Sequence, residues 1–364
     1  MPKEPVRPGI SNIKPYIPGK PAEEAERELR ISGVIKLASN ENPLGPSPKA
    51  LEAVNKYLKD MSLYPDQLCF ELTRLIAERL GMTPENIAIG NGSDELMLLA
   101  ALAFISAGDE VIISLNTFST YEMVSRLMDA SIVRINLKNY TYDLSAMAKA
   151  AEPKTKLIFV CNPNNPTGTM NGKKEMDELV SKTPANSIVV IDEAYGDYVE
   201  SADYPDSIKY VRENKNVIVL RTFSKIYGIA GLRVGYAVSR PEIIKFLNLV
   251  RLPFSVNRLG QIAAIACLSD TGHVEKSRKN NSEGKEYLYK ELDRLGVSYL
   301  KTEANFIFIN LNSDADAAFM GLMRRGVIVR PLASFGMPGS IRVTIGTPEQ
   351  NRKFIKALSE IANQ

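Results

Sequence analysis

The chain has 364 residues, 45% of them apolar, and a net charge of +3. This length allows two domains and a large core, and the interspersed charges give no basic surface for nucleic acid or for a membrane. No apolar run approaches the ~18 residues of a membrane span, and the N-terminal residues lack the apolar core of a signal peptide.

The counts of cysteine and histidine restrict the chemistry. Cys69, Cys161 and Cys267 are odd in number and far apart, which indicates reduced thiols in a cytoplasmic protein. The single histidine, His273, lies in a segment that we interpret as an exposed loop between helices. This argues against a Ser-His-Asp hydrolase and against a metal site built from several histidines, because both depend on histidine at the site. We expect no metal site, and proton transfer must use lysine, tyrosine or a carboxylate.

The first two thirds of the chain predict a mainly parallel sheet wrapped by helices. Helices are expected around Ala22–Arg30, from Pro48 to about Leu58, and from Phe70 to Leu80. From Ile87 to about Val250, short apolar runs alternate with amphipathic stretches, as in α/β proteins. Seven runs are strand candidates: Ile87–Ile89, Glu110–Ser114, Ser131–Asn136, Leu157–Val160, Ile188–Ile191, Val217–Leu220 and Val234–Val238.

The last third predicts a smaller α/β layer. Two helical stretches beginning near Gly260 precede strands at Asn305–Asn310, Val327–Arg330 and Ser340–Ile345, with a helix ending at Gly326 and a final helix over Pro348–Asn363. We therefore divide the chain into three segments. Residues 1–40 form an N-terminal arm and part of the small domain, residues 41–255 form the large domain, and residues 256–364 form the small domain.

Three consecutive strand candidates end in polar side chains. Asn165 follows the first, Asp192 and Tyr195 follow the second, and Ser224 and Lys225 follow the third. In open α/β sheets, ligands bind outside the carboxyl ends of the strands. A lysine opposite an acid fits pyridoxal phosphate, because the amine forms a Schiff base and the carboxylate keeps the pyridine nitrogen protonated. The alternative is that Asp192 is a helix cap or part of a structural salt bridge.

A glycine-containing turn indicates a phosphate site. Ile89–Glu95 joins a strand to a helix, and the free N–H groups and dipole of a helix N-terminus attract anions. Its alternative role is an ordinary turn capped by Ser93 or Asp94. The hydroxyl of Ser224 and the guanidinium of Arg233 add donors suited to phosphate.

Two arginines late in the chain stand among apolar neighbours. Arg330 and Arg342 suit bidentate binding of a carboxylate if they are buried. The alternative places each on the exposed polar face of its strand.

Together these segments resemble the fold-type I pyridoxal-phosphate enzymes and, within them, the histidinol-phosphate aminotransferases. The resemblance covers nearly the whole chain and rests on Leu37–Pro43, Tyr64–Asp66, Gly92–Glu95, Asn162–Gly168, Asp192–Tyr195, Arg221–Lys225, Ala230–Arg233 and Ile341–Gly346. The chain departs from its relatives at Asn116, where they often have proline, and at Phe118, where they often have tyrosine. Ring stacking needs only the aromatic face that Phe118 retains.

The resemblance implies a role for each matching residue. Lys225 is the Schiff-base lysine, Asp192 pairs with the pyridine nitrogen, and Asn165 and Tyr195 contact the phenolic oxygen. Phe118 stacks on the cofactor ring. The phosphate is held by the backbone of Ser93 and Asp94, by the side chains of Ser224 and Arg233, and by Tyr64 of the partner subunit. The anionic groups of the substrate are bound by Tyr16, Arg330 and Arg342.

The implied activity is amino transfer from histidinol phosphate to 2-oxoglutarate, in histidine biosynthesis, by a homodimer with shared active sites. On the same fold, an aromatic amino-acid aminotransferase and a threonine-phosphate decarboxylase remain alternatives. A serine-type acyl enzyme is a remote one, since Thr222–Lys225 and Ser255–Asn257 resemble S-x-x-K and S-x-N motifs but no K-T-G follows.

Overall fold

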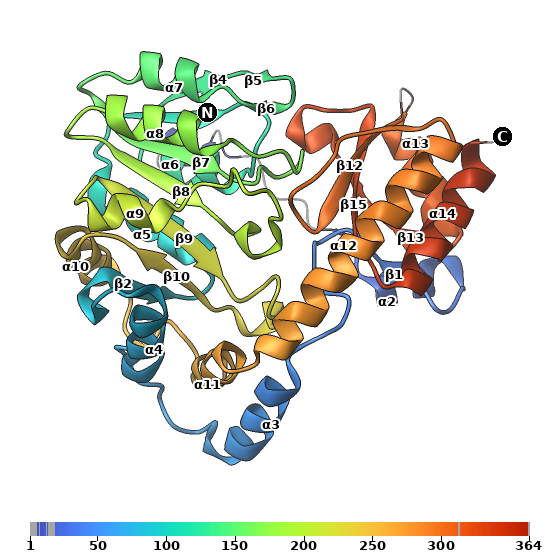
Figure 1. Cartoon of the computed structure of the whole chain (residues 1–364), viewed down its shortest axis with the longest axis horizontal. Coiled ribbons are helices and arrows are strands. Elements are labelled where there is room, and N and C mark those ends of the chain that lie inside the picture. The colour runs from blue at the N-terminus through green and yellow to red at the C-terminus, as the bar shows by residue number, and fades with distance from the viewer. Residues whose placement is uncertain (1–5, 7, 12, 14–18, 312–313, 363–364) are drawn as a thin grey trace.

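The computed structural model describes residues 6, 8–11, 13, 19–311 and 314–362. Figure 1 shows two parts side by side, with a large sheet and its helices on the left and a smaller α/β layer on the right. The long helix α12 (Thr271–Arg294) runs from the large part into the small one. Tyr16, one of the predicted substrate-binding residues, lies outside the described residues.

The large sheet confirms the predicted seven-stranded, mainly parallel architecture. Its spatial order is β2 (Ile87–Gly90), β10 (Gly235–Val238), β9 (Val217–Thr222), β8 (Ile188–Asp192), β7 (Thr155–Cys161), β3 (Glu110–Ser114) and β4 (Ser131–Ile135). Only β10 runs antiparallel to its neighbours. The central strands are buried throughout, which explains their continuous runs of Val and Ile, since a parallel sheet is covered on both faces.

Helices pack against this sheet and against one another. They are α3 (Pro48–Tyr57), α4 (Phe70–Leu80), α5 (Ser93–Phe104), α6 (Thr120–Leu127), α7 (Leu144–Ala150), α8 (Lys173–Lys182), α9 (Ser207–Arg212), α10 (Pro241–Val250) and α11 (Arg258–Leu268). A two-stranded hairpin, β5 (Leu137–Lys138) with β6 (Thr141–Tyr142), follows β4. The apolar cluster of the large part extends from Ala50 to Val274, so α11 and the start of α12 pack with it. The division at residue 255 stays a prediction.

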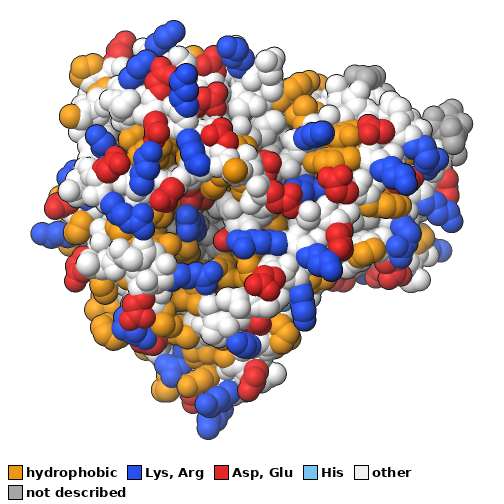
Figure 2. All heavy atoms as spheres, in the orientation of Figure 1, with side chains coloured by type: hydrophobic (Ala, Val, Ile, Leu, Met, Phe, Trp, Pro, Cys, Tyr) orange, Lys and Arg blue, Asp and Glu red, His pale blue; other side chains and the backbone are white. Residues whose placement is uncertain are grey.

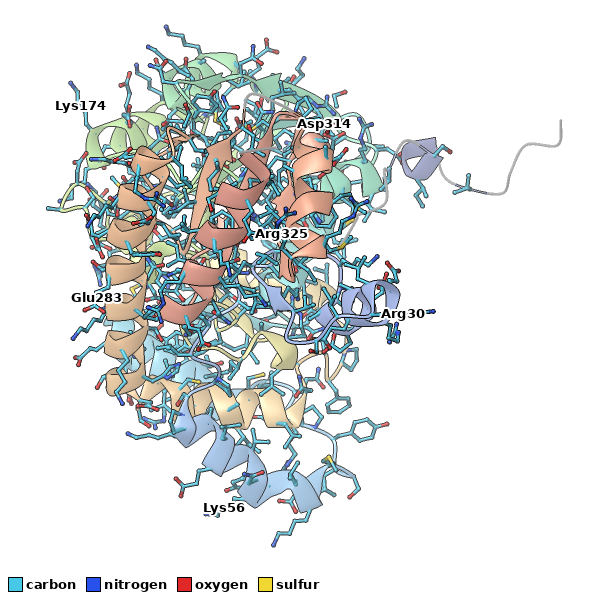
Figure 3. The ribbon with its side chains drawn as sticks, turned by 90° about the vertical axis from the view of Figure 1, so that its right-hand side faces the viewer. Arg30, Lys56, Lys174, Glu283, Asp314 and Arg325 are labelled. Atoms are coloured by element: carbon cyan, nitrogen blue, oxygen red, sulfur yellow. The ribbon has the colours of Figure 1, made fainter. Side chains whose placement is uncertain are left out.

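The small part is built on an antiparallel sheet. Its strands lie in the order β11 (Ser298–Tyr299), β12 (Phe306–Asn310), β15 (Ser340–Thr344) and β14 (Arg330–Pro331), and α13 (Ala315–Arg324) and α14 (Pro348–Ala362) complete the layer. Figure 3 shows α12, α13 and α14 side by side, with Glu283, Asp314 and Arg325 on this outer face. The predicted strand Val327–Arg330 is two short strands, because β13 (Val327–Ile328) pairs with β1 (Ile35–Lys36) and Arg330 pairs in the other sheet.

The N-terminal region joins the small part. α2 (Ala22–Leu29) packs through Ala25 against Met323 of α13 and Ile328 of β13, and its end is marked by Arg30 in Figure 3. The short helix α1 (Pro8–Ser11) contacts α6 in the large part. The predicted arm thus contributes one strand and one helix to the smaller layer.

The interpretation of His273 as an exposed loop residue is wrong. It lies in the first turn of α12 and is only 7% exposed. The cause is the preceding Asp270, whose side chain accepts a hydrogen bond from the His273 backbone N–H and begins the helix at Thr271. An Asp cap starts a helix even when glycine follows in its first turn.

The surface carries charges of both signs. Figure 2 shows Lys and Arg interspersed with Asp and Glu over the face in view, without a broad area of one sign. None of the helices in the described part of the chain is long and apolar enough to cross a membrane.

Candidate active site

A cavity of about 670 Å³ opens beside the ends of β7, β8 and β9, and residues of the small part also line it. Ten of the residues selected from the sequence line this cavity: Ser93, Asp94, Phe118, Asn165, Asp192, Tyr195, Ser224, Lys225, Arg233 and Arg342. The parallel order of β7, β8 and β9 explains the convergence, because their carboxyl ends meet at one edge of the sheet.

Lys225 brings an amine into this cavity. Its Nζ donates a hydrogen bond to the carbonyl oxygen of Ser39 at 3.3 Å and lies 5.6 Å from the ring centre of Tyr195. Burial, with a further contribution from the nearby Arg342 guanidinium, lowers the pKa of Lys225 to about 8. A minor but usable fraction of this amine is therefore neutral near physiological pH, as a nucleophile or a proton acceptor requires.

Asp192, at the end of β8, brings a buried carboxylate into the same cavity. Its Oδ2 accepts a hydrogen bond from Tyr121 Oη at 2.6 Å, and its Oδ1 accepts one from the Ala194 N–H at 3.0 Å. Burial raises the pKa of Asp192 to about 6, while these two hydrogen bonds act in the opposite direction. The group is thus ionised at neutral pH and suited to a cationic partner in the cavity.

Tyr195 and Asn165 are held by the segment Leu37–Asn42 and by the small part. Asn40 Nδ2 donates to Tyr195 Oη at 2.9 Å, and burial raises the pKa of Tyr195, so its hydroxyl stays protonated. Asn165 Oδ1 accepts a short hydrogen bond from Arg342 Nη1, while Arg342 Nη2 donates to the Ala38 carbonyl at 2.7 Å. These bonds tie the two parts of the protein together across the cavity.

An anion-binding corner forms where α5 begins. The helix starts at Ser93 after Gly92, whose φ is 79°, and no side chain caps it, so the alternative of a turn capped by Ser93 or Asp94 is wrong. Arg233 donates from Nη1 to Ser224 Oγ at 3.2 Å and from Nη2 to Asp94 Oδ2 at 3.1 Å. The uncapped N–H groups, a hydroxyl and a guanidinium therefore gather at one end of the cavity.

The close approach at Gly92 shows that this corner has no room for a side chain. A Cβ on Gly92 would lie 2.5 Å from Arg233 Nη2, and a Cβ on Gly235 would lie 2.5 Å from the Ser93 backbone nitrogen. Pyridoxal phosphate fits the residues present, since a phosphate suits this corner, a cationic ring nitrogen suits Asp192, and an aldehyde carbon suits Lys225.

Two predicted residues do not line the cavity. Tyr64 is 79% exposed and its ring stacks on Phe254 at 4.8 Å between centroids, beside a separate surface hollow. Arg330 and Arg342 are both buried, which excludes for each of them the alternative of an exposed arginine on the polar face of a strand. The two arginines are directly opposite in the pairing of β14 with β15, so both side chains project from the same face of the sheet.

Sequence reasoning missed the contacts of Asn40 and Tyr121. Asn40 is buried with a φ of 56°, a conformation that asparagine tolerates better than most residues, and it reaches Tyr195 across 155 positions of sequence. Tyr121 lies in the first turn of α6, three positions after Phe118, which precedes the helix, and the two rings meet edge to face at 5.8 Å between centroids. This short separation from the predicted ring-stacking residue is the one signal that pointed to Tyr121. Within the described ranges, no group of three or more His, Cys, Asp or Glu is placed to hold a metal ion.

Comparison with known proteins agrees with the geometry. The family described as aminotransferase class I and II matches residues 32–358. The histidinol-phosphate aminotransferase of Moorella thermoacetica is 52% identical over 356 residues, covering 98% of this chain and 92% of that protein. The corresponding enzyme of Caldicellulosiruptor saccharolyticus is 47% identical over 352 residues, covering 97% and 98%.

Solved structures extend the agreement to the fold. The histidinol-phosphate aminotransferase of Sinorhizobium meliloti, determined in complex with pyridoxal-5'-phosphate, superimposes with a TM-score of 0.91 at 26% identity, covering 99% of this chain and 98% of that one. The aspartate aminotransferase of Thermotoga maritima shares the fold with a TM-score of 0.85 at 21% identity, covering 99% and 100%. The predicted fold type I is confirmed. The chain therefore belongs to the class I and II aminotransferases, which depend on pyridoxal phosphate, and within them to the histidinol-phosphate aminotransferase family.

Proposed function

We propose that this protein transfers the amino group of histidinol phosphate to 2-oxoglutarate, yielding imidazole-acetol phosphate and glutamate, as a step of histidine biosynthesis. The observation that carries the proposal is the pairing of a buried amine, Lys225, with a buried carboxylate, Asp192, in one cavity that also has an anion-binding corner. The relatives from Moorella and Caldicellulosiruptor, which share about half of this sequence, support the choice of substrate.

The cavity offers a partner for each part of the cofactor. Asp192 would hold the pyridine nitrogen, and Phe118 would stack on the ring. Arg233, Ser224 and the N–H groups at the start of α5 would hold the phosphate, and the hydroxyl of Tyr195 and the amide of Asn165 would hold the phenolic oxygen. When bound, pyridoxal phosphate withdraws electrons from the substrate Cα and so makes its proton acidic.

Lys225 moves that proton. Its neutral Nζ would accept the proton from the substrate Cα and return it to C4′ of the cofactor, so the same amine would serve first as base and then as acid. The pKa of about 8 places this amine near the optimum for both roles at physiological pH. The Ser39 carbonyl fixes the direction of Nζ, and the Asp192 carboxylate would maintain the positive charge on the ring nitrogen of the bound cofactor.

Arg330, Arg342 and Tyr16 are proposed to bind the anionic groups of the two substrates. Arg330 and Arg342 are like charges on adjacent strands, and an anion between their planar guanidiniums would be stabilised by both. Both substrates carry such groups, the donor a phosphate and 2-oxoglutarate two carboxylates.

A homodimer with shared sites would explain the exposed surface around Tyr64. Met61, Leu68 and Leu252 are each about two thirds exposed or more, and they lie on the segments that flank Tyr64 and Phe254. Figure 3 shows α3, which leads into this loop and is marked by Lys56, at the lower end of the molecule. An apolar area of this kind is typical of an interface between copies. We propose that Tyr64 of the partner subunit completes the phosphate site.

Mixing two inactive variants tests the shared site. In a heterodimer of Lys225→Ala with Tyr64→Ala, one of the two sites combines a native Lys225 with a native Tyr64. Random mixing should then restore about a quarter of the wild-type activity, because half of the dimers are mixed and each has one native site. Heterodimers that form and regain no activity would contradict the proposal, as would a fully active monomer.

The substrate is tested by comparing donors. We expect the highest kcat/KM for histidinol phosphate with 2-oxoglutarate, against phenylalanine, tyrosine and threonine phosphate. Preferred aromatic donors would favour an aromatic aminotransferase, and release of CO₂ from threonine phosphate would favour a decarboxylase. We also propose a cytoplasmic location, which three buried thiols without disulfides support.

A further inference from the structure

One of the side-chain hydrogen bonds that join the two parts of the protein beside the cavity is made by Asn116. Asn116 lies in the loop between β3 and α6, and its Nδ2 donates to the carbonyl oxygen of Phe335 at 2.6 Å. Phe335 ends the short turn Ala333–Phe335 that follows β14, and it lines the cavity. The bond therefore connects a loop of the large part to a wall of the cavity supplied by the small part.

Both sides of this bond are fixed by their surroundings. Gly336 has a φ of 76°, and a Cβ there would lie 2.9 Å from Asn116 Nδ2, so only glycine leaves room for the amide. On the other side, the Asn116 carbonyl accepts from Asn164 Nδ2 at 3.1 Å, and Thr117 Oγ1 donates to Asn164 Oδ1 at 3.0 Å. The amide of Asn116 thus has a defined position from which to hold the turn.

The turn that contains Phe335 supports the side chain of Arg330. The Arg330 guanidinium lies 5.8 Å from the ring centre of Phe335, within the range of a cation–π contact. Arg330 is also opposite Arg342 in the strand pairing. If the Phe335 turn moved, the ring would move with it, and the Arg330 guanidinium would lose the surface on which it rests.

We propose that Asn116 is a positioning residue that sets the affinity for the substrate's anionic group. It holds Phe335, which lines the cavity, and through that ring it holds Arg330, which lies opposite the cavity-lining Arg342. The inference rests on the anion-binding role proposed above for Arg330.

The test measures binding of a dicarboxylate that cannot react. Succinate is a dicarboxylate that has no oxo group and is one carbon shorter than 2-oxoglutarate, and its binding to the holoenzyme is followed by the visible spectrum or by calorimetry. In Asn116→Ala we expect its Kd to rise about 3- to 10-fold, as the loss of one good hydrogen bond implies. The KM for 2-oxoglutarate should rise by a similar factor, whereas kcat and the affinity for the cofactor should change less than about two-fold, because Asn116 touches neither the lysine nor the phosphate corner.

Asn216→Ala is the matched control. Asn216 is also half-buried, and its Nδ2 donates to the Ala185 carbonyl at the same 2.6 Å, but both residues belong to the large part. We expect succinate binding in this variant to stay within about two-fold of wild type. Asn116→Gln, which keeps an amide donor on a longer side chain, should weaken binding less than Asn116→Ala.

Three results would overturn the inference. They are unchanged succinate binding in Asn116→Ala, an equal loss in Asn216→Ala, and a loss of cofactor affinity in place of succinate affinity. The test is separate from the choice of amino donor. If wild type transferred no amino group from histidinol phosphate while Asn116→Ala still weakened succinate, the proposed donor would be wrong and the role of Asn116 would stand.

Discussion

Replacing Lys225 with methionine should make the apoprotein more stable while it abolishes activity. Lys225 is half-buried, and desolvation of its amine lowers the pKa from 10.5 to about 8 on folding. At 1.36 kcal/mol per pH unit, holding this group as an ammonium costs the folded state roughly 3 kcal/mol at pH 7. Methionine removes the charge and fills similar space, but it also loses the hydrogen bond to Ser39, which contributes about 1 kcal/mol. The net expected gain is about 2 kcal/mol.

The pH dependence gives the effect a signature. Below the folded pKa of about 8 both states of wild type are protonated, so the full penalty is present. Between about 8 and 10.5 only the unfolded state keeps the proton, so the stability of wild type rises with pH toward that of the variant. With roughly 2.1 cal/mol/K of unfolding entropy per residue over 364 residues, 2 kcal/mol corresponds to about 3 °C in Tm. The advantage of Lys225→Met should be near 3 °C at pH 7 and vanish by about pH 10.

The test is to measure the Tm of the wild-type and Lys225→Met apoproteins between pH 7 and pH 10. The Lys285→Met variant is the control. Lys285 is buried, whereas Lys225 is half-buried, and the Nζ of Lys285 lies 2.9 Å from a carboxylate oxygen of Glu200. Its removal leaves that carboxylate without its cation, so this variant should lose stability. The reasoning is refuted if Lys225→Met is less stable than wild type at pH 7, or if its advantage is the same at pH 7 and pH 10.

Three further substitutions address the rest of the site. Tyr121→Phe removes the 2.6 Å hydrogen bond to Asp192, which should raise the pKa of that carboxyl further above its ordinary value. The acid limb of the kcat/KM profile should then move to higher pH, and an unmoved limb would argue against the contact. Arg233→Ala removes charged donors from the anion corner and should weaken cofactor binding about 10- to 100-fold in equilibrium dialysis, with an unchanged Kd as the contrary result. Arg342→Lys keeps the charge but loses the fork that reaches Asn165 and Ala38, so kcat/KM should fall about 10- to 100-fold in steady-state assays; full activity would contradict the need for a guanidinium.

The reactive residues were predictable because they follow strong local patterns. Asp192 and Lys225 each come just after a run of buried β-branched residues, and a parallel sheet necessarily brings the ends of such runs together. The seven strands followed from the same runs. Arg233 could be assigned to the phosphate corner because it ends a glycine-containing loop shortly after Lys225 and carries a guanidinium suited to phosphate.

The residues that orient these groups were not predictable in this way. Tyr121 reaches Asp192 across 71 positions and Asn116 reaches Phe335 across 219, and no local periodicity encodes such contacts. His273 was misplaced because one cap, Asp270, outweighed the glycine that suggested a loop. The split of Val327–Arg330 into two strands depends on β1, which arrives from the far end of the chain.

The central claim is that the amine of Lys225 is the group that joins the cofactor. Reduction of the holoenzyme with borohydride, followed by digestion and mass spectrometry of the peptides, tests it directly. We expect the reduced cofactor to be attached to the peptide that contains Lys225 and to no other lysine. Attachment to a different lysine, or no attachment in a fully active holoenzyme, would contradict it.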